Sequence, residues 1–356
     1  MTAVTVGSLC TGIAGLEHGL TLAGLNTETV FVSDIDKGAC TWLEANVSAP
    51  NLGDFTALDE LPPVDILTVG FPCQPLSLAG QRKGVNDERW LFDDICRLVG
   101  RMGSRPVLFL ENVPGLLSAN NGDAMARVVH GLAAIGYSIT WGTMAAADLG
   151  APHRRLRWWG LAYPADTDDN NRIGRQEPAG RTVAQHAADA AADADGARHE
   201  RKRVTVAIEP TDAGAGSDQH AVADATGTER RGPEQQDLPS PNGPTAEPGE
   251  RACSLTERFG PYAGAIGRWE CVLGRTAPDP SVDGRLNPSF CEWMMGYPEG
   301  WVTDTLPSRN HSLKALGNAV VPQCAAAAFT ALAARIDDQA ADGRSQTPAA
   351  RSLTRW

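Results

Sequence analysis

Val64-Asp-Ile-Leu-Thr-Val-Gly-Phe71, followed by Pro72-Cys73-Gln74-Pro75, is the stretch of sequence that decides the fold. Its apolar residues run almost without interruption, which is typical of a strand buried on both faces of a parallel sheet. Pro72 ends the strand because proline has no amide proton to donate to the ladder. Cys73 therefore follows the carboxyl end of a buried strand, where open α/β sheets place their ligands and reactive groups.

The position of Cys73 has two interpretations. Its thiol lies between two prolines on a rigid backbone, which makes it a candidate nucleophile. A buried structural cysteine is the alternative, because that is the commonest fate of a free cysteine. Position alone leaves these two interpretations evenly matched.

A second apolar strand ends in an acid. This stretch reads Pro106-Val-Leu-Phe-Leu-Glu111-Asn112-Val113-Pro114-Gly115. Two neighbouring strand ends thus offer a thiol and a carboxyl group, which favours the nucleophile. Together, Phe-Pro-Cys-Gln-Pro and Glu-Asn-Val-Pro-Gly resemble motifs of the cytosine-C5 DNA methyltransferases. The resemblance implies an α/β, Rossmann-like methyltransferase fold that uses S-adenosylmethionine.

The N-terminal stretch has the pattern of a nucleotide-binding entrance. We expect a strand over residues 2–10, a tight turn over residues 11–15 and a helix over residues 16–23. Glycines in such a turn let a ligand approach the backbone closely at a helix N-terminus.

An acid follows the next strand of the pattern. Residues 29–33 are expected to form a strand that ends in Asp34-Ile35-Asp36, about 20 residues after the glycine turn, which suits hydrogen bonding to a ribose diol. Capping the helix that follows is an alternative role, and both roles are compatible. In the family, the acid at the position of Asp34 binds S-adenosylmethionine.

The glycine turn resembles the family pattern Asp-Leu-Phe-Ala-Gly-x-Gly-Gly, with departures at Ser8, Cys10 and Ala14. Cys10 replaces an aromatic residue that normally packs on the cofactor. Further on, Asp54 resembles an acid that contacts the adenine amino group, and Gly-Asn-Ala-Val at residues 317–320 resembles the family's tenth motif. The resemblance assigns S-adenosylmethionine to residues from all these segments and their neighbours: Leu9, Cys10, Gly12, Ile13, Gly15, Asp34, Ile35, Asp54, Phe55, Gly70, Pro72, Leu91, Asn318, Ala319 and Val320.

Two arginines lie in a third motif. Ala151-Pro-His-Arg-Arg155-Leu-Arg157 matches the family's Gln-x-Arg-x-Arg, with His153 in place of the glutamine. Alternate residues of a strand point to one side, so Arg155 and Arg157 are expected on one face, where they suit phosphate or base contacts. A solvated basic edge is the alternative.

DNA contacts are expected from two further segments. The loop over residues 77–84 is basic, as a loop closing over DNA is expected to be, although an ordinary surface loop has the same composition. In residues 259–273, Tyr262, Arg268 and Trp269 suit DNA contacts, and a small local core explains them equally well. Four residues are assigned to DNA: Gln74, Ser77, Arg82 and Arg268.

The resemblance implies covalent catalysis on cytosine. Attack of the Cys73 thiolate on C6 makes C5 nucleophilic. Glu111 supplies or shares a proton near N3, which burial of its carboxyl group favours. Arg157, with Arg155 beside it, holds the ring or its phosphate. Because a duplex hides C6, the cytosine must flip out of the stack.

The net charge of −12 is unusual for a DNA-binding protein. Residues 166–250 carry 17 acidic and 9 basic side chains, a net of −8, which leaves −4 for the rest. A DNA-facing surface must therefore be a local patch. The same segment has few large apolar residues and repeats a loose Ala-Asp theme, so it is expected to be poorly ordered.

The family motifs extend over residues 1–163 and 284–330 in family order. A smaller, irregular target-recognition region is expected between them, and a helix over residues 325–336 returns to the catalytic domain. The expected domains are a catalytic domain (1–165), an insert with target recognition (166–283), the return segment (284–336) and a flexible tail (337–356).

Several classes of protein are disfavoured by composition. No apolar run reaches the roughly 18–20 residues of a membrane span, and the N-terminus lacks the basic start of a signal peptide. The eight cysteines include no Cys-x-x-Cys pair, which argues against disulfides and zinc. We expect a cytoplasmic monomer of a bacterial or phage-infected cell, without a metal, that acts on double-stranded DNA with a cognate restriction endonuclease as a possible partner.

Three other functions fit part of the sequence. A related methyltransferase acting on RNA cytosine is disfavoured by the long insert at the DNA-recognition position. A dinucleotide-dependent oxidoreductase explains the glycine turn and Asp34 but gives Cys73 and Glu111 no shared task. An inactive DNA-binding protein of the same fold fits the altered glycine turn but not the intact Cys73 and Glu111.

Overall fold

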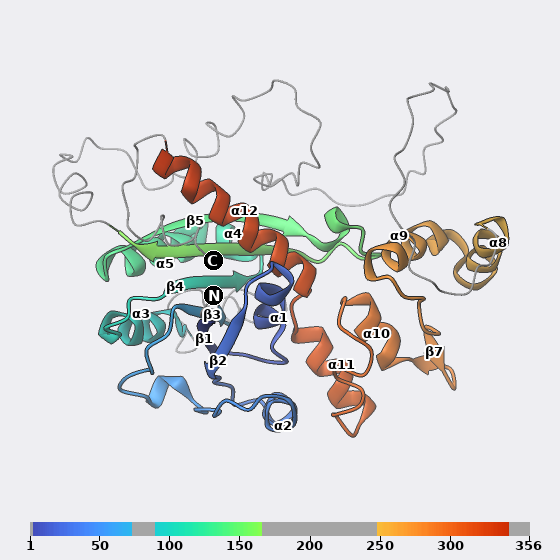
Figure 1. Cartoon of the computed structure of the whole chain (residues 1–356), viewed down its shortest axis with the longest axis horizontal. Coiled ribbons are helices and arrows are strands. Elements are labelled where there is room, and N and C mark those ends of the chain that lie inside the picture. The colour runs from blue at the N-terminus through green and yellow to red at the C-terminus, as the bar shows by residue number, and fades with distance from the viewer. Residues whose placement is uncertain (1–2, 73–89, 166–247, 342–356) are drawn as a thin grey trace.

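The computed structural model describes residues 3–72, 90–165 and 248–341 of the chain, and a six-stranded sheet forms their centre (Figure 1). The sheet order is β2-β1-β3-β4-β6-β5. The first four strands in that order are parallel, and the pairs β4–β6 and β5–β6 are antiparallel. The strands span Val4–Leu9 (β1), Thr27–Phe31 (β2), Ile66–Gly70 (β3), Val107–Asn112 (β4), Tyr137–Ala145 (β5) and Leu156–Pro164 (β6).

The strand predicted around residue 67 is confirmed as the buried β3. Ile66, Leu67 and Val69 have no exposed surface, because β3 lies between β1 and β4 and helices cover both faces of the sheet. Val69 pairs with Leu9 of β1, and Gly70 pairs with Glu111 of β4. This register brings the carboxyl ends of three strands to one edge of the sheet.

Two helical layers enclose the sheet. On one face, α1 and the long α12 pack against side chains such as Phe109, Trp159 and Leu161. On the other face, α3 and α5 pack against Leu108 and Leu110. Successive residues of β4 thus point to opposite layers, as a strand requires. The helices of this part are α1 (Gly15–Leu22), α2 (Lys37–Asn46), α3 (Phe92–Arg101), α4 (Gly115–Ser118), α5 (Asp123–Ala134) and α12 (Pro322–Ala341), with short 3-10 turns η1 (Phe55–Ala57), η3 (Ala119–Gly122) and η4 (Ala146–Leu149).

The C-terminal segment is more helical than predicted. The expected irregular region contains α8 (Pro248–Phe259), η6 (Gly260–Tyr262) and α9 (Ala263–Leu273), which lie at the right of Figure 1. The expectation of poor order is therefore wrong for residues 248–250, which are the start of α8. After them come the hairpin of β7 (Ser281–Val282) and β8 (Arg285–Leu286), then α10 (Pro288–Met294) and α11 (Arg309–Asn318).

The flexible tail predicted from residue 337 is wrong for its first five residues, which continue α12 to Ala341. The helical stretch Arg309–Asp338 is, within the described residues, long and apolar enough to cross a membrane by length and composition alone. Its apolar residues instead belong to the core, because α12 packs on α1 and β5 and buries Ala325, Phe329 and Leu332.

Some predictions fall outside the described residues. They concern the loop with Cys73, Gln74, Ser77 and Arg82, and most of the insert at residues 166–247.

Candidate active site

A cavity of about 830 Å³ opens at the carboxyl ends of β1, β3 and β4. Its walls come from the glycine turn after β1, the segments after β2 and β3, the end of β4 and the end of α11. Every residue assigned above to S-adenosylmethionine lines this cavity except Leu9. The assignment of Leu9 is therefore wrong. Leu9 is the last residue of β1, and it has no exposed surface because its side chain packs into the core.

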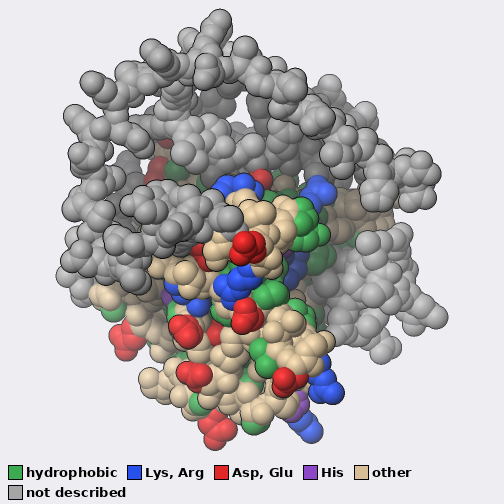
Figure 2. Space-filling model, turned by 90° about the vertical axis from the view of Figure 1, so that its right-hand side faces the viewer, with side chains coloured by type: hydrophobic (Ala, Val, Ile, Leu, Met, Phe, Trp, Pro, Cys, Tyr) green, Lys and Arg blue, Asp and Glu red, His purple; other side chains and the backbone are tan. Residues whose placement is uncertain are grey.

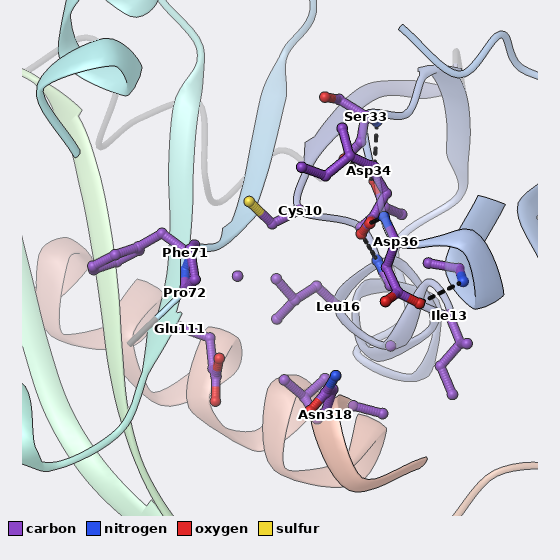
Figure 3. A pocket seen from close by; sticks show the side chains of 18 of the residues that line it. Cys10, Ile13, Leu16, Ser33, Asp34, Asp36, Phe71, Pro72, Glu111 and Asn318 are labelled. Atoms are coloured by element: carbon purple, nitrogen blue, oxygen red, sulfur yellow. Dashed lines mark hydrogen bonds between the residues drawn. The ribbon is translucent and has the colours of Figure 1, made fainter. Parts of the chain in front are cut away.

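The glycine turn has an unusual backbone. Cys10 (φ 54°), Gly12 (φ 60°) and Ala14 (φ 56°) all adopt the left-handed region, which is unfavourable for residues with a Cβ atom. The thiol of Cys10 points into the cavity (Figure 3), and burial, with Asp34 and Asp54 nearby, raises its pKa to about 12. Cys10 is therefore a neutral wall residue at physiological pH.

Backbone amides hold the acid at this end of the cavity. The Asp34 carboxylate accepts hydrogen bonds from the amides of Gly12 and Asp36, both at 2.8 Å. The helix cap considered for this acidic segment is confirmed at Asp36, which accepts from the amides of Gly38 and Ala39 at the start of α2, and not at Asp34.

Three charged side chains, Asp54, Asp36 and Lys314, also line this end of the cavity. The Asp54 carboxylate is exposed and accepts from the amide (3.0 Å) and hydroxyl (2.7 Å) of Thr56. Asp36 forms an ion pair with Lys314 of α11, and both line the cavity. Lys314 was not singled out from the sequence, although it lies three residues before the Gly-Asn-Ala-Val motif.

Glu111 lies at the other end of the cavity (Figure 3). Arg157 is its partner, with Nε 3.0 Å from Oε1, and the two side chains are only 22% and 13% exposed. The strand register brings the two side chains together. Glu111 pairs with Trp159 of β6, and Arg157 lies two residues from Trp159 on the same face of the sheet. Burial raises the pKa of Glu111, and Arg157 and Arg155 offset part of that rise.

Arg155 does not lie on the strand as predicted. The strand β6 begins at Leu156, and Arg155 precedes it with a φ of 33°. The side chain donates to the backbone carbonyls of Gly317 (3.0 Å) and Ala319. Burial, followed by repulsion from Arg157, lowers the pKa of Arg155 to about 10, so it remains a cation.

Asn112 is a site residue that the sequence did not reveal. Its side-chain amide donates to the carbonyl of Phe71 (3.1 Å), and its oxygen accepts from the amide of Val113 (2.8 Å). It is 2% exposed and lines the cavity. Asn112 thus fixes the backbone at Phe71, directly before Pro72. An amide side chain next to Glu111, at the carboxyl end of the apolar strand, was the available signal.

The three residues considered for DNA contacts at residues 259–273 differ in position. Trp269 is fully buried and donates to the carbonyl of Trp293 at 3.0 Å, so the alternative of a local core is confirmed for it. Arg268 and Tyr262 are exposed. Figure 2 shows basic and acidic side chains interspersed on the face of the molecule where these helices lie.

Comparison with protein families excludes one of the functions left open by the sequence. Residues 4–334 match the model of the C-5 cytosine-specific DNA methylases. The chain belongs to this family. Membership contradicts the dinucleotide-dependent oxidoreductase considered above.

Individual Type II methyltransferases resemble part of the chain. The Type II methyltransferase M.BsuFI of Bacillus subtilis is 37% identical over 42% of this chain and 36% of its own length. The Type II methyltransferase M.HhaI of Haemophilus parahaemolyticus is 34% identical over 46% of this chain and 50% of its own length. The chain therefore matches between about one third and one half of these relatives.

A solved structure supports the fold. The crystal structure of the S. pombe Dnmt2 methyltransferase matches with a TM-score of 0.51 at 16% identity, covering 94% of this chain and 99% of that one. The Rossmann-like methyltransferase fold predicted from the motifs is thus confirmed.

Proposed function

We propose that this methylase transfers a methyl group from S-adenosylmethionine to C5 of cytosine in double-stranded DNA. One observation carries the proposal: the Glu111–Arg157 pair and the glycine turn with Asp34 lie at two ends of one cavity. A cofactor at one end would thereby face a base at the other. Family membership supports the same reaction.

The cavity fits the cofactor in size and charge. A volume of about 830 Å³ lies within the range of cofactor sites, roughly 300–1,000 Å³. S-adenosylmethionine supplies an electrophilic methyl group on a cationic sulfur. Asp34 and Asp54 along the walls favour a cationic ligand, and the glycine turn lets it approach the backbone.

The catalytic roles follow the chemistry of cytosine. Cys73 is the proposed nucleophile toward C6, on the strength of the sequence. Glu111 is the proposed proton donor or hydrogen-bond partner at N3, and its raised pKa favours a shared proton. Arg157 was expected to hold the ring or its phosphate, and its ion pair supports a further role in orienting the Glu111 carboxyl group. The bonds of Arg155 to residues 317 and 319 favour a positioning role over the base contact expected earlier.

The partners proposed from the sequence are retained. Double-stranded DNA is the proposed substrate, with the target cytosine flipped out of the duplex, and Gln74, Ser77, Arg82 and Arg268 are the proposed contacts. A cognate restriction endonuclease, a monomeric state and a cytoplasmic location complete the proposal.

Transfer of a labelled methyl group tests this function. The protein is incubated with S-adenosylmethionine carrying a tritiated methyl group and with either duplex DNA of varied sequence or transfer RNA. Digestion to nucleosides should place the label in 5-methyldeoxycytidine. Label in 5-methylcytidine from RNA alone, or in no nucleoside, contradicts the proposal.

A further inference from the structure

The glycine turn needs outside support to keep its shape. Three residues within five, two of them Cys10 and Ala14, have a left-handed backbone. Such conformations persist when the surrounding structure imposes them. Two supports are local: the bond from the Gly12 amide to Asp34 and that from the Ala14 amide to the Thr11 carbonyl (3.1 Å).

A third support comes from the far end of the chain. The indole Nε1 of Trp301 donates to the carbonyl of Ile13 at 3.0 Å, across 288 residues of sequence. The same indole packs on His18 of α1 and Trp42 of α2, with ring centroids 4.9 and 5.3 Å apart. The Trp301 carbonyl also accepts a hydrogen bond from the indole of Trp42. Trp301 therefore contacts the turn and both helices that flank it.

A buried acid holds Trp301 in place. Glu292 of α10 is 1% exposed and accepts from the amides of Gly300 (3.0 Å), Val302 and Thr303 (3.2 Å). These amides surround Trp301 in the chain. The loop over residues 300–303 is thus fixed to α10, and its indole is fixed to the turn. None of the four loop residues lines the cavity.

We infer that Trp301 is a positioning residue for the cofactor: it holds the turn over residues 10–15 in its binding conformation without touching the ligand. The inference rests on the proposed function, since it takes S-adenosylmethionine as the ligand of the cavity. The turn is held at the Gly12 amide, which donates to Asp34, and at the Ile13 carbonyl, which accepts from the Trp301 indole.

A conservative substitution separates the hydrogen bond from the packing. Trp301→Phe keeps an aromatic ring against His18 and Trp42 but removes the donor to the Ile13 carbonyl. Without this bond the turn of the free protein should leave its binding conformation part of the time, and the cofactor must restore it. The Kd for S-adenosylmethionine, measured by calorimetry, should therefore rise by up to about three- to tenfold, the equivalent of one neutral hydrogen bond. The transfer rate at saturating cofactor should stay within about twofold, because uniform binding alone is lost.

Thr305→Val is the matched control. It removes the hydroxyl that accepts from Asn46 Nδ2 (3.0 Å) at the same interface but leaves the turn untouched. Its Kd should equal that of the parent. Equal Kd values for the parent and Trp301→Phe overturn the inference. Failure of the parent itself to bind S-adenosylmethionine overturns the proposed function instead.

Hydrogen exchange on the unaltered protein gives a test that does not depend on the variant folding. Binding of S-adenosylhomocysteine should slow exchange in peptides covering residues 11–16 and, through Trp301, in those covering 300–303. Peptides from α5 serve as the reference. Protection of the turn with no change at residues 300–303 overturns the inference.

Discussion

At one end of the cavity, backbone amides hold Asp34; at the other, arginine side chains surround Glu111. The first arrangement depends on the shape of a strained turn, so it responds to anything that loosens the backbone. The second depends on charges in a buried site, so it responds to protonation and to the loss of a partner. We therefore propose that the Asp34 end binds the cofactor and that the Glu111 end carries out the proton chemistry.

One residue connects the two ends. Arg155 donates to the carbonyls of Gly317 and Ala319, and its charge also acts on Glu111. Residues 317–320 line the cavity. A change at Arg155 should therefore affect both ends, whereas changes at Asp34 or Glu111 should affect one. Substitutions can test this division directly.

Glu111→Ala should have the largest effect. Loss of the proposed proton donor should lower the methyl-transfer rate by about 10²–10⁴, the usual contribution of general acid catalysis. Glu111→Gln can donate a hydrogen bond to N3 but not a proton. Its methyl-transfer rate should lie between those of the parent and Glu111→Ala. Single-turnover rates measure both variants. A Kd for S-adenosylmethionine that changes as much as the rate contradicts the division of roles.

Arg155→Met should follow in size, with an effect at both ends. Removing charged hydrogen bonds to two backbone carbonyls should lower the free energy of unfolding by about 2–4 kcal/mol. The release of residues 317–320 should also raise the Kd for the cofactor. Loss of the charge should raise the pKa of Glu111 further, which shifts the pH dependence of methyl transfer to higher pH. Denaturant unfolding, calorimetry and single-turnover rates against pH measure these changes. Arg154→Met, at the exposed neighbouring position, is the control and should leave all three unchanged.

Asp34→Asn should affect the binding end alone. The variant weakens the charged hydrogen bonds to the turn and the proposed ribose contact, so the Kd for S-adenosylmethionine should rise about 10- to 100-fold. The rate at saturating cofactor should be close to that of the parent. Glu44→Gln removes an exposed acid of α2 outside the cavity and should leave the Kd unchanged. A slow rate at saturation would place Asp34 in the chemistry instead.

The smallest effect concerns a buried acid outside the cavity. Glu17 of α1 is 8% exposed; burial raises its pKa, and the hydroxyls of Thr68 and Ser8 offset part of the rise. Its contribution to stability is thus fully present below its pKa in the unfolded chain and is lost as the pH rises through the folded value. Glu17→Gln should match the parent in stability near about pH 4 and exceed it near about pH 8. Melting temperatures at both pH values measure the difference, and a constant difference contradicts it.

The parts of the fold that were predictable from sequence depend on local pattern. The apolar run of β3 predicts its burial, and Glu111 follows from a strand that ends in an acid. The sequence pattern also predicts correctly that Arg157 lies on a strand, which is β6. Leu9 was misassigned because family resemblance does not show which way the last residue of a strand points.

The parts that were not predictable depend on contacts between distant segments. Trp301 touches Ile13 across 288 residues, and no spacing in the sequence indicates that contact. Arg155 turned toward α11 for the same reason, because the carbonyls at residues 317 and 319 are available only in the folded chain. Trp269 was ambiguous because a buried and an exposed tryptophan have the same local pattern until the helix is packed.

Covalent trapping tests the central claim most directly. The protein is incubated with S-adenosylmethionine and duplex DNA containing 5-fluorocytosine, beside the variants Cys73→Ser and Glu111→Ala. Fluorine cannot leave C5 as a proton does, so the account predicts a complex that survives denaturation with the parent. It predicts no complex with Cys73→Ser and slower formation with Glu111→Ala. A complex that forms equally well with Cys73→Ser, or none with the parent on DNA of many sequences, would contradict the account.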